Sequence, residues 1–171
     1  MSARAPLVLL ALVVACAPPP AGESPPVSGR TLAGAWNIAF TLDSQLASRN
    51  DDPVLSWQRA SDSAAVTGIL KGGQESRSTD ANGTPSARTA ATMTVDFTPL
   101  LGRQMSCFEP GKLELESEWD GDRVAIAFTP NVADCGFGGV GLWRNDTIRG
   151  AWSETSFVGP VSIGRFVMAR R

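Results

Sequence analysis

Apolar and polar residues alternate along most of the chain after residue 30. Trp36, Ile38 and Phe40, for example, are separated by asparagine and alanine. A period of two residues places alternate side chains on opposite faces of an extended strand, which is typical of half-buried antiparallel structure. No stretch after Thr31 keeps the 3.6-residue period of an amphipathic helix. The pattern therefore predicts an all-β fold.

Eight strands are predicted from this alternation. They span residues 32–42, 54–60 or 63–71, 89–98, 112–119, 123–129, 137–143, 147–154 and 161–169, and the stretch 54–71 has room for two short strands. Asp120-Gly121 and Asn145-Asp146 lie between apolar runs, and such pairs favour tight hairpin turns. Residues 72–87 are rich in Gly, Ser, Thr, Asp and Asn, which predicts a mobile surface loop.

Sequential strands joined as hairpins favour an antiparallel up-and-down barrel over residues 31–171, because closure leaves no open sheet edge. The alternative is a β-sandwich, which requires Greek-key crossings that the strand spacing does not indicate.

The first 30 residues differ from the rest of the chain. Residues 1–15 carry one arginine, Arg4, and an apolar run that is too short to span a bilayer, which is typical of an export signal. Residues 16–30 include five prolines between positions 17 and 26, which favour an extended spacer.

The end of this signal resembles the lipobox of bacterial lipoproteins in the string Val13-Val14-Ala15-Cys16. The resemblance implies that the signal is cut before Cys16, that this cysteine carries a diacylglyceryl group and that its amine receives a further acyl chain such as palmitate. The protein would then be anchored to a membrane of the cell envelope through lipid. Because Ala17 stands where aspartate tends to retain inner-membrane lipoproteins, we expect the outer membrane of a Gram-negative host, facing the periplasm or the cell surface.

The cysteine count agrees with export. If Cys16 carries lipid, Cys107 and Cys135 remain as a pair in an oxidising compartment, which predicts a disulfide. The predicted barrel places both in loops at the same end. The alternative is two free thiols or a two-cysteine metal site, for which no further soft ligand lies nearby.

Composition limits the chemistry. The chain has no His, a net charge of −2 and no basic run, so histidine-based catalysis is excluded and nucleic acid is not an expected partner. Glu114, Glu116 and Glu118 share one strand face and are interpreted as a solvated outer surface. No Gly-x-Ser-x-Gly motif or calcium loop is present. We therefore expect no enzyme activity, no metal and no cofactor.

A second resemblance lies at the first strand. Gly34-Ala35-Trp36 resembles the Gly-x-Trp signature of the lipocalin (calycin) superfamily, in which the tryptophan closes the barrel floor beneath a basic residue from the last strand. Arg165, Arg170 and Arg171 lie in the matching region. The resemblance implies a hydrophobic ligand inside the barrel, and seven aromatic residues are its predicted contacts: Trp36, Phe40, Phe97, Trp119, Phe128, Trp152 and Phe166.

These observations lead to two hypotheses. The first is a membrane-anchored lipoprotein whose barrel binds a small hydrophobic molecule or lipid. The alternative is a non-enzymatic interaction module with a filled barrel. Its contact surface would be either the loops at the end of the barrel that carries Cys107 and Cys135, or the face that bears Trp143. This tryptophan alternates with Val140 and Leu142 and is therefore expected to be exposed.

Overall fold

The computed structural model describes residues 30–48, 55–60, 65–103, 105, 111–128, 134–157 and 159–171. The signal, the lipobox with Cys16, nearly all of the proline-rich spacer and Cys107 lie outside the described residues, and the expectations for them stay predictions.

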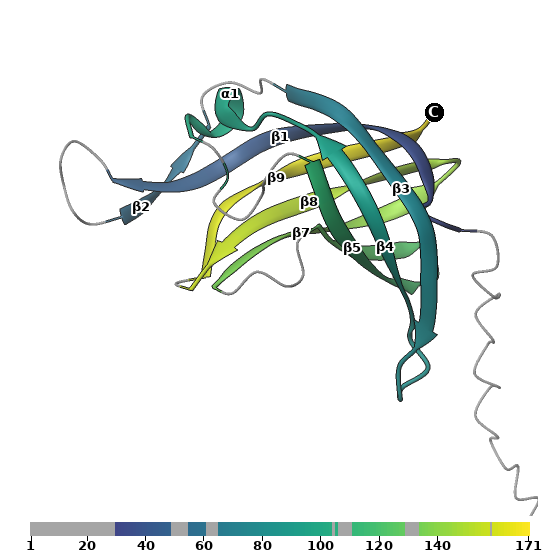
Figure 1. Ribbon diagram of the computed structural model, residues 1–171. Coiled ribbons are helices and arrows are strands. Elements are labelled where there is room, and N and C mark those ends of the chain that lie inside the picture. Colours follow the sequence, from purple (N-terminus) through teal and green to yellow (C-terminus); the bar gives the residue numbers. More distant parts are fainter. Residues whose placement is uncertain are drawn as a thin grey trace, which may run out of the picture.

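Antiparallel strands form almost the whole of the described chain (Figure 1). β1 pairs with β3, each strand from β3 onward pairs with the next, and β9 pairs back with β1. Eight strands therefore close into a barrel. The predicted up-and-down barrel is confirmed, and the sandwich alternative is wrong. The elements are β1 (Gly34–Ser48), β2 (Leu55–Arg59), β3 (Ala65–Thr79), β4 (Pro85–Thr94), α1 (Thr98–Leu101), β5 (Gly111–Asp120), β6 (Arg123–Ala127), β7 (Cys135–Arg144), β8 (Thr147–Ser156) and β9 (Gly159–Arg170).

The stretch 54–71 holds two strands, which was one of the two alternatives. β3 pairs with residues 34–41 of β1, and β2 pairs with residues 44–48 on the same flank. A bulge between Leu42 and Ser44 shifts the register of β1 against β9. Such a bulge bends the strand, and the far end of β1 projects beyond the barrel with β2 (Figure 1).

The predicted loop over residues 72–87 is wrong. β3 continues to Thr79 and β4 begins at Pro85, so the turn covers residues 80–84. Strand pairing uses backbone groups, so a polar segment with both faces in water can still form a hairpin. The turn is fixed by the Asp80 carboxylate, which accepts hydrogen bonds from the backbone N–H of Asn82 and Thr84 at 2.8 and 2.7 Å. The hydrogen bond from Thr84, more than that from Asn82, lowers the pKa of Asp80.

The expected exposure of Trp143 is also wrong. Its side chain is 4% exposed, whereas Val140 and Leu142 are 40% and 48% exposed. The inward face of β7 consists of Phe137, Trp143 and two glycines between them. A Cβ atom at Gly139 would lie 2.7 Å from the Phe166 ring, so the glycine leaves room for a side chain from another strand. Simple alternation of apolar residues assigned this face incorrectly.

The two ends of the barrel carry different structures. At one end, which we call the strap end, residues 30–33 lie beside the β5–β6 and β7–β8 turns and the end of β9. At the other, the helix end, α1 packs against the barrel with Leu100 and Leu101 buried. The β7–β8 turn has positive φ at Asn145 and Asp146, as a two-residue hairpin requires, and Gly121 has positive φ in the β5–β6 turn. The predicted turn at Asn145-Asp146 is therefore confirmed. The β5–β6 turn is also present, but it lies at Gly121 and Asp122, one residue later than predicted, because Asp120 still pairs with Arg123.

Candidate functional site

The seven aromatic residues predicted to bind a ligand are all buried, with at most 3% of each side chain exposed. Five of them form one cluster around Phe40. Its ring centroid lies 5.1 to 6.3 Å from those of Phe97, Phe128, Trp152 and Phe166. Phe137, which was not among the seven predicted contacts, joins them and stacks on Phe128 with ring centroids 4.7 Å apart. These side chains pack on one another at the distances of a close-packed core.

The other two predicted residues lie toward the strap end. The rings of Trp36 and Trp143 meet edge to face with their centroids 5.3 Å apart, and the indole nitrogen of Trp36 donates to the carbonyl of Leu32 at 3.1 Å. Trp119 lies beneath the guanidinium group of Arg77, which is 5.8 Å from its ring centre. Two buried polar atoms, Oγ1 of Thr89 and Nε1 of Trp119, have no hydrogen-bond partner within the described part of the chain.

The strap end is closed by the segment 30–33, which we call the strap. Its backbone N–H at Leu32 donates to Glu75, and its carbonyl at Arg30 accepts from Arg77. Its carbonyls at Thr31 and Ala33 accept from Arg170 at 2.7 and 3.2 Å. The strap is therefore bonded to β3 and to β9, the two strands that flank β1.

Arg30 connects the strap to the β5–β6 turn. Its side chain donates to the carbonyl of Gly121 at 2.6 Å and forms an ion pair with Asp122. The hydrogen bond from Arg30 is the largest cause of the lowered pKa of Asp122, and the charge of the same arginine adds to it.

A buried carboxylate lies at the helix end. Glu154 points inward from β8 with its side chain 0% exposed, and it accepts two hydrogen bonds from Arg103 at 3.0 and 2.7 Å. Ser162 of β9 donates to the same carboxylate at 3.0 Å. Arg103 lies two residues after the end of α1, so this double hydrogen bond links the segment after the helix to the barrel wall.

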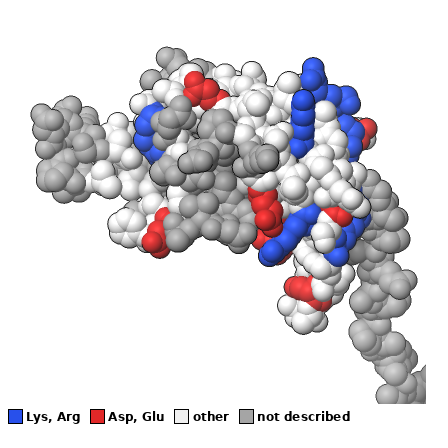
Figure 2. Space-filling view, viewed as in Figure 1, with Lys and Arg blue, Asp and Glu red and all other residues white. Residues whose placement is uncertain are grey.

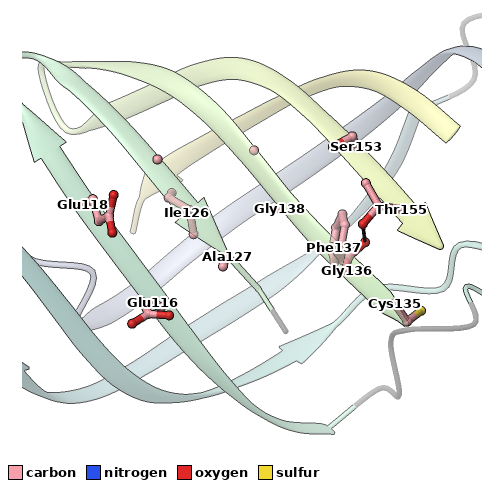
Figure 3. A pocket seen from close by; sticks show the side chains of 12 residues that line it. Glu116, Glu118, Ile126, Ala127, Cys135, Gly136, Phe137, Gly138, Ser153 and Thr155 are labelled. Atoms are coloured by element: carbon pink, nitrogen blue, oxygen red, sulfur yellow. Dashed lines mark hydrogen bonds between the residues drawn. The ribbon is translucent and has the colours of Figure 1, made fainter. Parts of the chain in front are cut away.

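A groove of about 430 Å³ lies on the outside of the barrel (Figure 3). Its floor consists of small residues on β6 and β7, and its two sides carry polar groups from β5 and β8. The lining residues with outward positions are Glu116, Glu118, Ala125, Ala127, Gly136, Gly138, Ser153 and Thr155. We call this concavity the outer groove.

Strand register explains the groove. Glu116, Ala127, Gly138 and Ser153 are successive partners across four neighbouring strands. With strands about 4.8 Å apart, the carboxylate side and the hydroxyl side are separated by about 14 Å of alanine and glycine. The floor is low because glycine has no side chain. At Gly136 a Cβ atom would lie 2.6 Å from Oγ1 of Thr155, which accordingly sits over that backbone.

The three glutamates of β5 point outward, as predicted, and two of them line the groove. Arg88 of β4 pairs with Glu116 at 3.1 Å and approaches Glu114 at 3.8 Å. Glu118 is exposed and forms no ion pair among the described residues. The groove therefore offers one carboxylate that is available to a cation.

Cys135 is the first residue of β7 and lines the outer groove, half-buried. The predicted bridge to Cys107 stays a prediction, because Cys107 is outside the described residues. Within the described ranges, no three His, Cys, Asp or Glu side chains converge as metal ligands. Over the same ranges, no helix has the length and apolar character needed to cross a membrane.

The outer groove could not be recognised from the sequence, because its residues come from four strands and none belongs to a recognisable motif. The inward aromatic positions were found from alternation alone. A scan against protein-family models finds no match to this chain, and a search of curated proteins finds none either.

Proposed function

We propose that this chain is a lipid-anchored, non-enzymatic protein of the bacterial cell envelope, and that its filled barrel presents the outer groove to a partner protein. The observation that carries the proposal is the cluster around Phe40. Five of the side chains expected to contact a ligand contact each other instead. This packing favours the interaction module over the carrier of a hydrophobic molecule.

The groove favours an extended polypeptide segment with a basic side chain. Its floor runs along β6 and β7, and Ala125, Ala127 and Gly138 let another backbone approach closely. Glu118 forms no ion pair among the described residues. Its carboxylate therefore complements a lysine or arginine of the partner segment. Ser153 and Thr155 supply hydroxyl groups on the opposite side.

Photo-crosslinking in the native envelope tests the groove. A photoreactive residue at Ser153 is expected to capture a segment that contains lysine or arginine, and Glu118→Lys is expected to abolish this adduct. Glu114→Lys is the matched control, because Glu114 lies on the same face of the same strand but does not line the groove. An adduct that Glu118→Lys leaves unchanged contradicts the proposal.

Native mass spectrometry of the protein purified from its envelope tests the filled barrel. A mass that includes acyl chains at Cys16 and no further molecule supports the proposal. A retained non-covalent small molecule would instead restore the carrier hypothesis. The same mass reports the proposed disulfide between Cys107 and Cys135, which removes two hydrogens. That bridge closes a loop with 27 intervening residues, and its loss by Cys135→Ser is expected to lower the free energy of unfolding by about 3–4 kcal/mol.

A further inference from the structure

Three arginines and two exposed apolar side chains share one part of the outer wall at the strap end. We call these residues the arginine face: Arg123, Val140, Leu142, Arg144 and Arg149. All five point outward from β6, β7 and β8. Leu142 is the register partner of Arg123 on one side and of Arg149 on the other. A leucine that is 48% exposed therefore lies directly between two guanidinium side chains.

The charges of this face are not neutralised by ion pairs. Arg123, Arg144 and Arg149 form none among the described residues. Asp122 forms its ion pair with Arg30, and the charge of Arg144 also contributes to lowering the pKa of Asp122. Asp146 lies 3.5 Å from Arg170. Asp120, the register partner of Arg123, is exposed beside the face.

Other parts of the wall differ. Over β3 to β5, acidic and basic side chains lie next to one another (Figure 2). Arg88 on β4 pairs with glutamates of β5, and Arg77 on β3 pairs with Glu75. The arginine face thus combines three arginines that form no ion pair among the described residues with exposed apolar area. This combination is typical of surfaces that meet anionic lipid headgroups.

The start of the described chain lies beside this face. Arg30 is bonded to Gly121 and Asp122, which immediately precede Arg123. In the sequence, 13 residues separate Cys16 from Arg30, and no chain of that length can reach farther than about 50 Å. An anchor at Cys16 would therefore be joined to the barrel at the strap end, beside the arginine face.

We infer that the arginine face docks on the anionic headgroups of the bilayer that holds the lipid anchor. This inference rests on the proposed function, because it assumes the lipid anchor at Cys16. It adds which part of the barrel faces the membrane. Leu142 and Val140 enter the headgroup region, and the three arginines contact lipid phosphates. The outer groove then stands farther from the membrane, because its residues lie closer to the helix end on the same strands.

The test uses the mature lipidated chain in vesicles of phosphatidylcholine, with and without phosphatidylglycerol. A nitroxide label at Leu142→Cys is expected to be shielded from an aqueous relaxation agent in the anionic vesicles and exposed in the neutral ones. A label at Thr67→Cys is the control, because Thr67 is exposed on β3. A Leu142 label that stays in water in both vesicles overturns the docking, as does shielding that does not depend on phosphatidylglycerol.

A second measurement distinguishes membrane binding by the arginine face from membrane binding by the lipid anchor. The chain with Cys16→Ser carries no lipid, and its co-sedimentation with the anionic vesicles is expected to fall about thirtyfold on the double change Arg123→Gln and Arg149→Gln. Arg88→Gln is the matched control, with an expected change below about twofold. Equal binding of the double variant and the parent overturns the inference.

The two proposals fail in distinguishable ways. If the mature chain carries no lipid yet the Cys16→Ser chain binds anionic vesicles through the two arginines, the anchor fails and the docking stands. If the chain is lipidated and the Leu142 label stays in water, the anchor stands and the docking fails. Shielding of Leu142 in the native envelope but not in lipid vesicles assigns the face to a protein partner and also overturns the docking.

Discussion

The guanidinium carbon of Arg170 lies 4.6 Å from the centre of the Trp36 ring, although the two residues are near opposite ends of the chain. The same guanidinium group donates hydrogen bonds to two carbonyls of the strap. One side chain from the last strand therefore covers the tryptophan of the first strand and holds the closing segment over it. This is the arrangement that the calycin resemblance implied for an arginine of the last strand.

Removing this arginine is expected to destabilise the barrel. Arg170→Met keeps the aliphatic stem but loses the cation–π contact and the hydrogen bonds to Thr31 and Ala33, which together contribute about 2 kcal/mol. The measurement is the free energy of unfolding in urea. Arg171→Met is the control, because Arg171 is exposed and its structural contact is the backbone bond to Ala35. Equal effects of the two substitutions would contradict the role of Arg170.

The buried hydroxyl of Thr89 predicts a stabilising substitution. Thr89 is 1% exposed, and its Oγ1 has no partner among the described residues. Thr89→Val keeps the shape and removes the desolvated group, so the free energy of unfolding is expected to rise by about 1 kcal/mol. Thr92→Val, at an exposed position of the same strand, is expected to change it by less than about 0.5 kcal/mol. A loss of stability in Thr89→Val would reveal a partner such as a buried water.

Two arginine–glutamate pairs are expected to differ in their contribution to stability. Arg103 donates twice to Glu154, whose side chain is fully buried, whereas Arg88 and Glu116 are both partly exposed. Arg103→Ala is expected to lower the free energy of unfolding by about 3 kcal/mol, because a buried carboxylate loses two hydrogen bonds from a guanidinium group. Arg88→Ala is expected to cost at most about 0.5 kcal/mol. Thermal unfolding of both variants compares them directly, and a similar fall in Tm for the two would argue against the buried pair.

The contact between Arg30 and Asp122 predicts a dependence on pH. The hydrogen bond from Arg30 lowers the pKa of Asp122 from the ordinary value of 3.8, so its stabilising effect is present above pH 3.8 and is lost as pH falls through the lowered value. Arg30→Gln is expected to return the pKa of Asp122 toward 3.8, which an NMR titration of the carboxyl carbon measures.

Asp80 is the internal control in the same titration. Its lowered pKa results chiefly from the backbone N–H of Thr84, so Arg30→Gln is expected to leave it unchanged. A shift of both carboxyls would indicate a general loss of structure, and a shift of neither would mean that the strap is not fixed by Arg30 in solution.

Much of the wall could be predicted because strand alternation is a local signal. Ile38 and Phe40 point into the barrel and the residues between them point outward, because successive side chains of a strand lie on opposite faces. The hairpin at Asn145 needs only two neighbouring residues with positive φ. The errors occurred where this local signal is ambiguous. Glycines on the inward face of β7 hid the burial of Trp143, and a polar hairpin has no apolar face from which to recognise the strands between 72 and 87.

The candidate sites depend on longer-range relationships. Alternation placed Phe40, Phe97 and Phe166 inside, but it could not show that their rings contact each other, because they come from different parts of the barrel. Glu118 and Ser153 face the same groove only because the hydrogen bonding of β5 to β8 sets their register.

By itself, the sequence determined the period of the strands, the tight turns and the net charge of −2, since each depends on neighbouring residues or on a sum over the chain. Only the tertiary structure decided how the barrel closes and how its charges are distributed. Glutamates of β5 and arginines of β6 to β8 lie on different parts of one wall, because backbone pairing fixes which residues of separate strands stand side by side. A chain with a negative net charge therefore carries a local positive face. This face could not be predicted without knowing which residues of neighbouring strands are paired.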